Sequence, residues 1–231
     1  MKRFYKDVSV QGGAEGFAVL LDGRPVKTPG HNGLVLPTRA LAEAIAGEWR
    51  AQDGEIVPTT MPLLRLANTV IDGIALNRED VIGAILRFGE NDLLCYRAEQ
   101  PRELAALQAR NWDPLLAWAA RRYGVTFQTT AGFTHIDQPA DTLAVLRAAV
   151  RGYDAFALAA LHVVASIAGS LVLALALAEG ETTPARLFEL ARLDEDYQAG
   201  KWGQDTEAQV RATALARELD KAAEFLAASR R

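Results

Sequence analysis

The sequence contains a single cysteine, Cys95, among 231 residues. One thiol excludes an intramolecular disulfide framework and any cysteine-rich metal site, and it is typical of a protein from a reducing compartment. Histidine is almost as scarce: His31, His135 and His162 stand far apart, without the clustered ligands that a zinc site needs. We therefore predict that the chain binds no metal and no cofactor, and that Cys95 is a buried structural thiol.

The sequence also has no excess of positive charge. Lysine and arginine number 25 against 29 aspartate and glutamate residues, a formal net charge of −4, so no bulk attraction draws the chain to nucleic acid or to anionic lipid. The chain opens without the apolar core of a secretory signal or an Arg/Ser-rich presequence. We expect a cytoplasmic protein that binds neither nucleic acid nor membrane.

Familiar catalytic motifs are absent as well. The sequence has no G-x-S-x-G, H-E-x-x-H or C-x-x-C segment. Residues 12–16, GGAEG, are rich in glycine, but they lack the G-x-G-x-x-G spacing and the Lys-Ser/Thr ending of a phosphate-binding loop. We interpret them as a hairpin turn.

One long uncharged run is present at residues 155–178, AFALAALHVVASIAGSLVLALALA. Its 24 residues exceed the length of about 20 that spans a bilayer. However, nine of them are alanine, and neither end carries the Lys/Arg cluster that usually flanks a membrane span. His162, Ser166 and Ser170 are spaced by four, which would place them on one helical face as a packing stripe. We predict one buried central helix over 155–178; a membrane anchor is the alternative.

The N-terminal end carries signals for short strands. Asp22-Gly23 separates two β-like runs and supplies the positive φ angles that a two-residue type I′ turn requires. Pro25 places the strand after this turn at the edge of a sheet. The predicted strands cover residues 5–10, 17–21, 24–27 and 34–36.

Helical periodicity dominates the rest of the chain. A helix follows Thr38, with Leu41, Ile45 and Trp49 in one apolar stripe. Predicted helices beyond Pro62 include residues 101–110, residues 112–123 closed by Gly124, residues 141–150, and one that begins at Thr183-Pro184 and carries Leu187, Leu190, Leu193 and Tyr197 inward.

These two patterns predict an α+β protein with two domains. Residues 1–58 would form a small β-hairpin/α layer, too small for a generous core of its own. Residues 59–231 would form a larger all-α orthogonal helical bundle around the buried central helix.

The densest chemistry lies between residues 194 and 207, which hold five carboxylates and one tryptophan. The segment could be a solvated helix end with Trp202 folded onto the core. It could instead be a recognition patch, because an aromatic side chain flanked by charges is typical of a protein interface. A third alternative is a small hydrolase that uses Glu195 and Glu207 as an acid/base pair. The candidate partner-binding residues are Asp194, Glu195, Asp196, Lys201, Trp202, Asp205 and Glu207.

An ordered set of short motifs resembles the ATP synthase F1 complex assembly factor two family, over almost the whole chain. The motifs are Arg3-Phe4-Tyr5, Leu21 to Pro29 (LDGRPVKTP), Glu48-Trp49, Cys95-Tyr96-Arg97, Trp112-Asp113-Pro114, Trp118-Ala119, Arg122-Tyr123-Gly124, Leu193 to Tyr197 and Lys201-Trp202-Gly203. No single motif is diagnostic, but their order is fairly specific.

The resemblance implies a non-catalytic assembly chaperone. It would bind the free α subunit of the F-type ATP synthase until the β subunit replaces it, and it would be a monomer. It also implies a functional acidic position in the C-terminal region, near Glu195 or Glu207. We favour Glu195, because residues 193–197 match the acidic stretch of the family without a gap.

Overall fold

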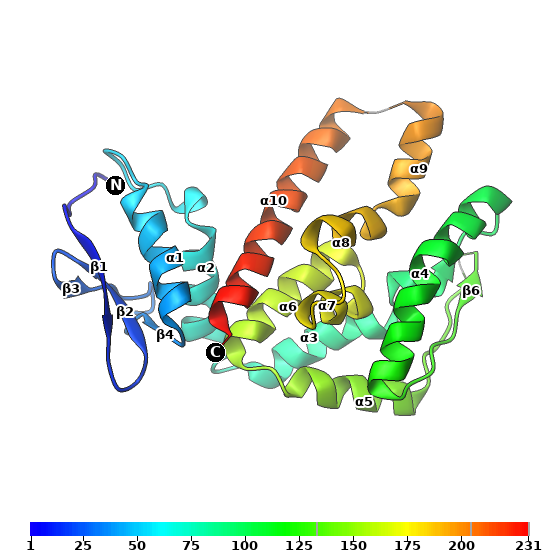
Figure 1. Ribbon diagram of the computed structural model, residues 1–231, viewed down its shortest axis with the longest axis horizontal. Coiled ribbons are helices and arrows are strands. Elements are labelled where there is room, and N and C mark those ends of the chain that lie inside the picture. The colour runs from blue at the N-terminus through cyan, green and yellow to red at the C-terminus, as the bar shows by residue number, and fades with distance from the viewer. Residues whose placement is uncertain (133, 204, 231) are drawn as a thin grey trace. The chain divides into compact units, whose positions relative to one another are not determined.

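The computed structural model describes residues 1–132, 134–203 and 205–230. The chain divides into two compact units. The first comprises residues 1–78, 154–160 and the C-terminal residues from 224; the second comprises residues 79–153 and 161–223. Strands gather in the N-terminal part and helices make up most of the remainder (Figure 1), which confirms the α+β class. The boundary between residues 58 and 59 stays a prediction.

Four strands form the sheet of the first unit: β1 (Val8–Gly12), β2 (Phe17–Leu21), β3 (Arg24–Pro25) and β4 (Val35–Leu36). β1 runs antiparallel to β2, and β3 and β4 also pair with β2. Asp22 and Gly23 have φ angles of 48° and 78°, which confirms the type I′ turn. Residues 12–16 link β1 to β2 as the predicted hairpin turn.

The first strand starts later than the sequence predicts, at Val8 rather than at residue 5. Tyr5 is buried, and its hydroxyl donates a hydrogen bond of 2.6 Å to the carbonyl of Trp49. This side chain fastens the segment before β1 to a helix, and the register between β1 and β2 begins only with the pair Val8 and Leu21.

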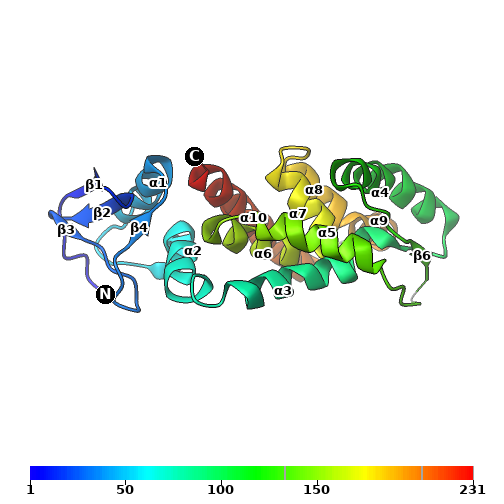
Figure 2. The same cartoon turned by 90° about the horizontal axis from the view of Figure 1, so that it is seen from below.

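Helix α1 (Arg39–Arg50) packs on this sheet (Figure 2). Thr38 caps it by accepting a hydrogen bond from the Leu41 amide. Leu41, Ile45 and Trp49 are all buried, so the predicted apolar stripe is confirmed.

Glu48 of α1 holds the start of helix α2 (Pro62–Thr69), which follows a short 3₁₀ turn at Pro58–Thr60. Its two carboxylate oxygens accept hydrogen bonds of 2.8 and 2.9 Å from the amides of Leu63 and Leu64. Glu48 therefore caps a helix that has no capping side chain of its own. A π-helical turn, Val70–Ile74, follows α2.

Replacing Glu48 with alanine is expected to lower the free energy of unfolding by about 1–2 kcal/mol, because two N–H groups at the start of α2 lose a charged acceptor. Denaturant unfolding measures the change. Glu43 is a half-exposed carboxylate on the same helix that pairs with Arg50 at 3.3 Å, and Glu43→Ala should change the stability by less than about 0.5 kcal/mol, because such surface ion pairs contribute little. Equal losses for the two variants would contradict the capping role.

The remaining elements are mostly helical. In chain order they are α3 (Arg78–Glu90), a 3₁₀ turn η3 (Leu93–Cys95), β5 (Tyr96–Arg97), α4 (Arg102–Tyr123), β6 (Thr130–Ala131), α5 (Ala140–Arg151), α6 (Ala155–Ala168), α7 (Leu171–Ala178), α8 (Pro184–Ala191), α9 (Leu193–Trp202) and α10 (Thr206–Ser229). β5 and β6 pair in parallel as a small sheet of two strands.

Helix α4 corrects the prediction of two helices over residues 101–123. It is continuous through Pro114. Residue 111, which lies between the two predicted helices, is part of α4, and the Asn111 side chain donates to the Leu107 carbonyl within it. Gly124 ends α4 with a φ angle of 70°, as predicted.

The uncharged run forms two helices, α6 and α7, so the prediction of one helix over 155–178 was wrong. Gly169 has a φ angle of 62°, and Ser170 is extended and caps α7 by accepting from the Leu173 amide. His162, Ser166 and Ser170 therefore do not form one stripe: Ser166 is exposed and His162 is half-buried. Burial and the nearby charge of Arg87 lower the pKa of His162.

The interior position of this run is confirmed for α7, in which every residue except Leu177 is buried. No helix within the described residues combines the length and apolar character of a membrane span. The membrane-anchor alternative therefore has no support in the structure.

The start of α7 rests on the buried carboxylate of Asp92. Its oxygens accept hydrogen bonds from the Leu94 amide at 3.0 Å and the Val172 amide at 2.9 Å. Desolvation raises the pKa of Asp92 to about 6, even though hydrogen bonds from Ser170 and the backbone oppose the shift. Cys95 lies nearby and is fully buried, and desolvation together with the charge of Asp92 raises its pKa to about 12.

Candidate partner-binding site

The acidic segment lies on α9 and at the start of α10. The predicted single helix from residue 184 to Tyr197 is interrupted at Arg192, so that α8 and α9 are separate. Leu193 is buried at the first position of α9, which leaves most of the following residues on the exposed side of that helix.

Asp194 is bound within the chain. Its Oδ1 accepts a hydrogen bond of 2.8 Å from Gln108 Nε2, and Gln108 Oε1 accepts one of 2.7 Å from the Ala98 amide. Gln108 is almost fully buried. Sequence reasoning missed Gln108, because a buried glutamine with a partner so distant in the chain leaves no local pattern.

The C-terminal half of α9 is held to α4 by Glu103. Its carboxylate accepts from the Tyr197 hydroxyl at 3.1 Å and lies 3.7 Å from Lys201 Nζ. Lys201 also lies over the Tyr197 ring, 5.5 Å from its centroid. Lys201 thus orients the end of α9 from a partly exposed position.

The other carboxylates of the segment are exposed but differ in their partners. Asp196 pairs with Arg192 at 3.6 Å, and Glu207 pairs with Arg211 at 3.5 Å. Asp205 accepts a hydrogen bond from the Glu207 amide at the start of α10. Glu195 is exposed and has no ion pair or hydrogen bond to any residue in the described ranges.

Trp202 ends α9 with 86% of its surface exposed. The alternative in which Trp202 folds onto the core is therefore wrong. Gly203, with a φ angle of 93°, turns the chain away immediately after it. An indole this exposed offers a large apolar area that a partner could bury.

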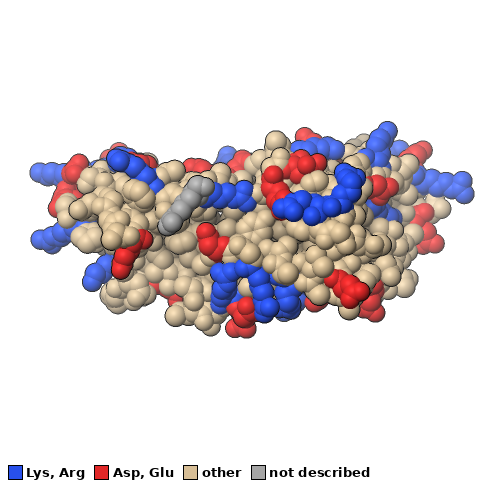
Figure 3. Space-filling view, turned by 60° about the horizontal axis from the view of Figure 1, so that its bottom comes forward, with Lys and Arg blue, Asp and Glu red and all other residues tan. Residues whose placement is uncertain are grey.

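The first half of α10 adds further apolar surface beside these charges. Val210 is 66% exposed and Leu215 is exposed as well, whereas Leu219 and Ala222 farther along are buried. Over the face in Figure 3, basic and acidic side chains occur together without one dominant basic field.

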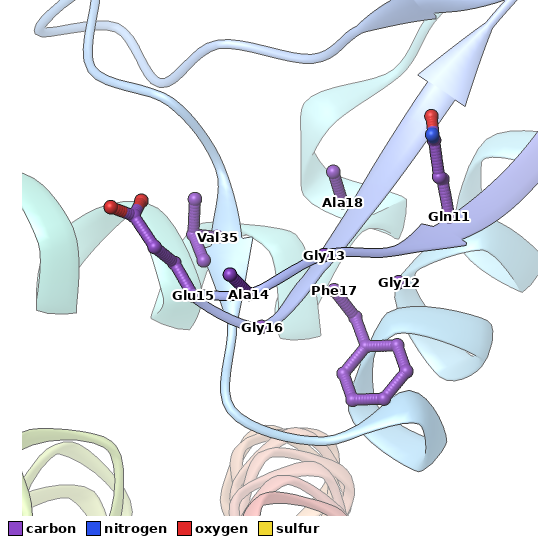
Figure 4. Close-up of a pocket in the computed structure, with 9 residues that line it drawn as sticks. All are labelled: Gln11, Gly12, Gly13, Ala14, Glu15, Gly16, Phe17, Ala18 and Val35. Atoms are coloured by element: carbon purple, nitrogen blue, oxygen red, sulfur yellow. The ribbon is translucent and has the colours of Figure 1, made fainter.

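Two hollows in the part of the chain that the structure describes bear on the acid/base alternative. A hollow of about 540 Å³ is lined by residues 96–100, Gly132 and Asp194, and another of about 240 Å³ lies at the β1–β2 hairpin tip (Figure 4). Glu195 and Glu207 line neither of them. Among the described residues, no group of three His, Cys, Asp or Glu side chains could hold a metal ion.

A family model described as ATP12 chaperone protein matches residues 2–120. The chain belongs to the ATP12 chaperone family. Over 99% of its length it is also similar to the crystal structure of Atp12 from Paracoccus denitrificans, with 40% identity, a TM-score of 0.96 and 98% of that chain covered. An aspartate-to-lysine mutant of the Paracoccus protein matches with 39% identity and the same TM-score and coverage. A putative chaperone from Agrobacterium tumefaciens matches with 45% identity, a TM-score of 0.95 and 86% of that chain covered.

Membership of the ATP12 family makes the protein an ATP synthase assembly chaperone rather than an enzyme. This corrects the hydrolase alternative built on Glu195 and Glu207. The acidic segment lies beyond the residues that the family model matches, but within the length covered by the solved ATP12 structures.

Proposed function

We propose that this ATP12 chaperone binds the free α subunit of the F-type ATP synthase and shields its subunit interface until the β subunit displaces it. The contact surface is formed by Glu195, Asp196, Trp202, Asp205 and Glu207, which we call the acidic surface. Asp194 and Lys201 support it from behind through their hydrogen bond and ion pair within the chain. We expect the chaperone to be monomeric and cytoplasmic.

The exposure of Trp202 carries this proposal. Trp202 is 86% exposed, and Glu195, two helical turns earlier on α9, forms no ion pair among the described residues, so this helix presents the aromatic and charged side chains of an interface hot spot. An unassembled ring subunit exposes apolar interface that would otherwise associate with itself. A contact made by one aromatic side chain and several charged ones can bind the exposed interface. It need not bind as tightly as the β subunit, so the β subunit can displace the chaperone.

The first test is capture of newly refolded α subunit by purified chaperone. We expect Glu195→Lys to weaken capture by about tenfold or more, because it places a cation where the α subunit meets a carboxylate. Trp202→Ala should weaken it by a similar factor. Both side chains are exposed, so denaturant unfolding should be nearly unchanged.

The matched control is Glu181→Lys, which reverses an exposed charge between α7 and α8. It should capture the α subunit normally. Glu207→Lys should have a smaller effect than Glu195→Lys, since Glu207 already pairs with Arg211. Undiminished capture by Glu195→Lys would remove that residue from the site, and a selective loss with Glu207→Lys would transfer the acidic position there.

Release is tested in the same assay by adding β subunit to the preformed complex. The α subunit should move from the chaperone to an α–β complex, because binding to the chaperone only has to be weaker than binding to the final partner. A chaperone–α complex that persists in excess β subunit would contradict the proposed mechanism.

A further inference from the structure

A second exposed aromatic residue, Phe4, lies in the first unit with 64% of its surface accessible. The segment that carries it is firmly held. The Arg3 amide donates to the Gly54 carbonyl at 2.9 Å, and the Arg3 guanidinium donates to the Gln52 carbonyl at 2.7 Å. Phe4 contacts Tyr5 edge to face, with ring centroids 5.4 Å apart. The fold therefore fixes this exposed ring in place.

Phe4 borders a hollow of about 510 Å³ beside strand β3. Leu21 and Trp49 form its buried side, and Pro25 and Val26 add further apolar surface. Ligand-binding pockets in proteins usually measure roughly 300–1,000 Å³ and are mainly apolar with a few polar groups. The hollow fits that description in size and lining.

One polar atom of the lining residues lacks a partner. Trp49 is only 8% exposed, and no group in the described ranges accepts a hydrogen bond from its buried Nε1–H. An unsatisfied buried donor is unfavourable and rare in folded proteins. Because the same indole forms part of the wall of the hollow, a bound partner that opened this wall and placed a carbonyl or carboxylate oxygen beside Nε1 would satisfy it.

The exposed charges around the hollow favour an anion. Arg24 and Lys27 line it, both are exposed, and neither forms an ion pair within the described residues. The one acid of the lining, Asp22, already accepts hydrogen bonds from the Lys6 and Asp7 amides. Those bonds, and the charges of Lys6 and Arg24, lower the pKa of Asp22. The lining of the hollow therefore holds two exposed cations and one carboxylate, and that carboxylate already accepts two hydrogen bonds.

We propose that this hollow binds an extended segment of the client protein in which apolar side chains alternate with carboxylates. The apolar side chains would cover Phe4 and the buried wall, and the carboxylates would meet Arg24 and Lys27. This inference rests on the proposed chaperone function for its client. It adds a basic, apolar contact that is separate from the acidic surface.

The test uses a synthetic peptide in which leucine and valine alternate with aspartate, and a matched peptide with lysine in place of aspartate. In ¹⁵N-labelled full-length protein, the indole N–H signal of Trp49 is identified by its loss in Trp49→Phe. The aspartate peptide should shift this signal and the lysine peptide should not. Binding should weaken by about tenfold in an Arg24→Glu/Lys27→Glu double variant.

Arg65→Glu, an exposed charge reversal on α2 of the same unit, is the control and should bind the aspartate peptide normally. Phe4→Ser should also weaken binding of the aspartate peptide, because it removes apolar surface while leaving Arg24 and Lys27 in place. Equal binding of both peptides, an unshifted Trp49 signal, or concentration-dependent self-association abolished by Phe4→Ser would overturn the inference.

A second readout separates this inference from the proposed function. If the unaltered protein captures the α subunit, the Arg24→Glu/Lys27→Glu variant should capture it more weakly, and full capture would overturn the inference alone. If the unaltered protein binds the aspartate peptide but never the α subunit, the hollow is supported and the choice of client is wrong.

Discussion

Replacing Trp112 with alanine is expected to lower the free energy of unfolding by about 3–5 kcal/mol, enough to unfold much of the protein at moderate temperature. The ring is fully buried, and its Nε1 donates a hydrogen bond of 3.0 Å to the Leu190 carbonyl of α8. The Arg97 guanidinium lies 5.2 Å from the ring centroid. The substitution would therefore leave a cavity, an unpaired carbonyl and an arginine without its aromatic contact.

Urea unfolding followed by circular dichroism measures this loss. Trp112→Phe is the matched control, because it retains most of the apolar volume while removing the hydrogen bond, and it should lose clearly less than the alanine variant. A loss below about 1 kcal/mol for Trp112→Ala would show that α4 and α8 do not depend on this contact.

The second large effect concerns Asp92 and depends on pH. In the folded protein its pKa is raised to about 6 from an ordinary value of 3.8, so the folded state binds the proton more tightly than the unfolded chain. The contribution of this group therefore favours folding at low pH and is lost as the pH rises from about 4 to about 6. The free energy of unfolding should fall by on the order of 3 kcal/mol across that window.

Asp92→Asn isolates this contribution. Its amide would direct N–H groups at backbone donors that now reach a carboxylate, so stability at pH 7 should fall by about 2–4 kcal/mol. Between pH 4 and pH 6 the variant should lack the decline seen in the unaltered protein. Asp141→Asn, an exposed aspartate on α5, should keep the decline. An identical pH dependence for Asp92→Asn and the unaltered protein would contradict the assignment.

Local signals allowed much of the first unit to be predicted. The turn at Asp22-Gly23 and the cap at Thr38 act within a few residues, so their sequence carries nearly all the necessary information. The same holds for Thr183-Pro184, where α8 begins as predicted and Thr183 caps it. The start of the first strand was predicted too early, at residue 5. The hydrogen-bond partner of Tyr5, Trp49, lies 44 residues away, so no local signal reveals this contact.

The helical part was predicted less well, since neighbouring signals competed. Gly169-Ser170 is a helix end followed by a cap, but the surrounding apolar residues favoured one continuous helix. Likewise, two helices were predicted over residues 101–110 and 112–123, but α4 is continuous through both ranges. At Gly169-Ser170 the outcome involves a long-range contact, the hydrogen bond that the Val172 amide donates to Asp92.

The proposed acidic surface was selected by composition and family resemblance, and the sequence did not distinguish the roles of its residues. Asp194 resembles its neighbours in sequence, yet Gln108 binds it from 86 residues away. Only the structure distinguishes that tethered carboxylate from the exposed Glu195. The family resemblance predicted a chaperone correctly, while the α subunit as its client stays a prediction.

The enclosed position of Cys95 has a practical consequence. A thiol that is fully buried and hard to ionise reacts poorly with maleimides and other alkylating reagents. A cysteine placed at an exposed site, such as Glu181→Cys, would then take up a fluorophore alone. Cys95 therefore need not be removed before a single site is labelled. The emission of a dye at the introduced cysteine could then follow the binding and release of a client in real time.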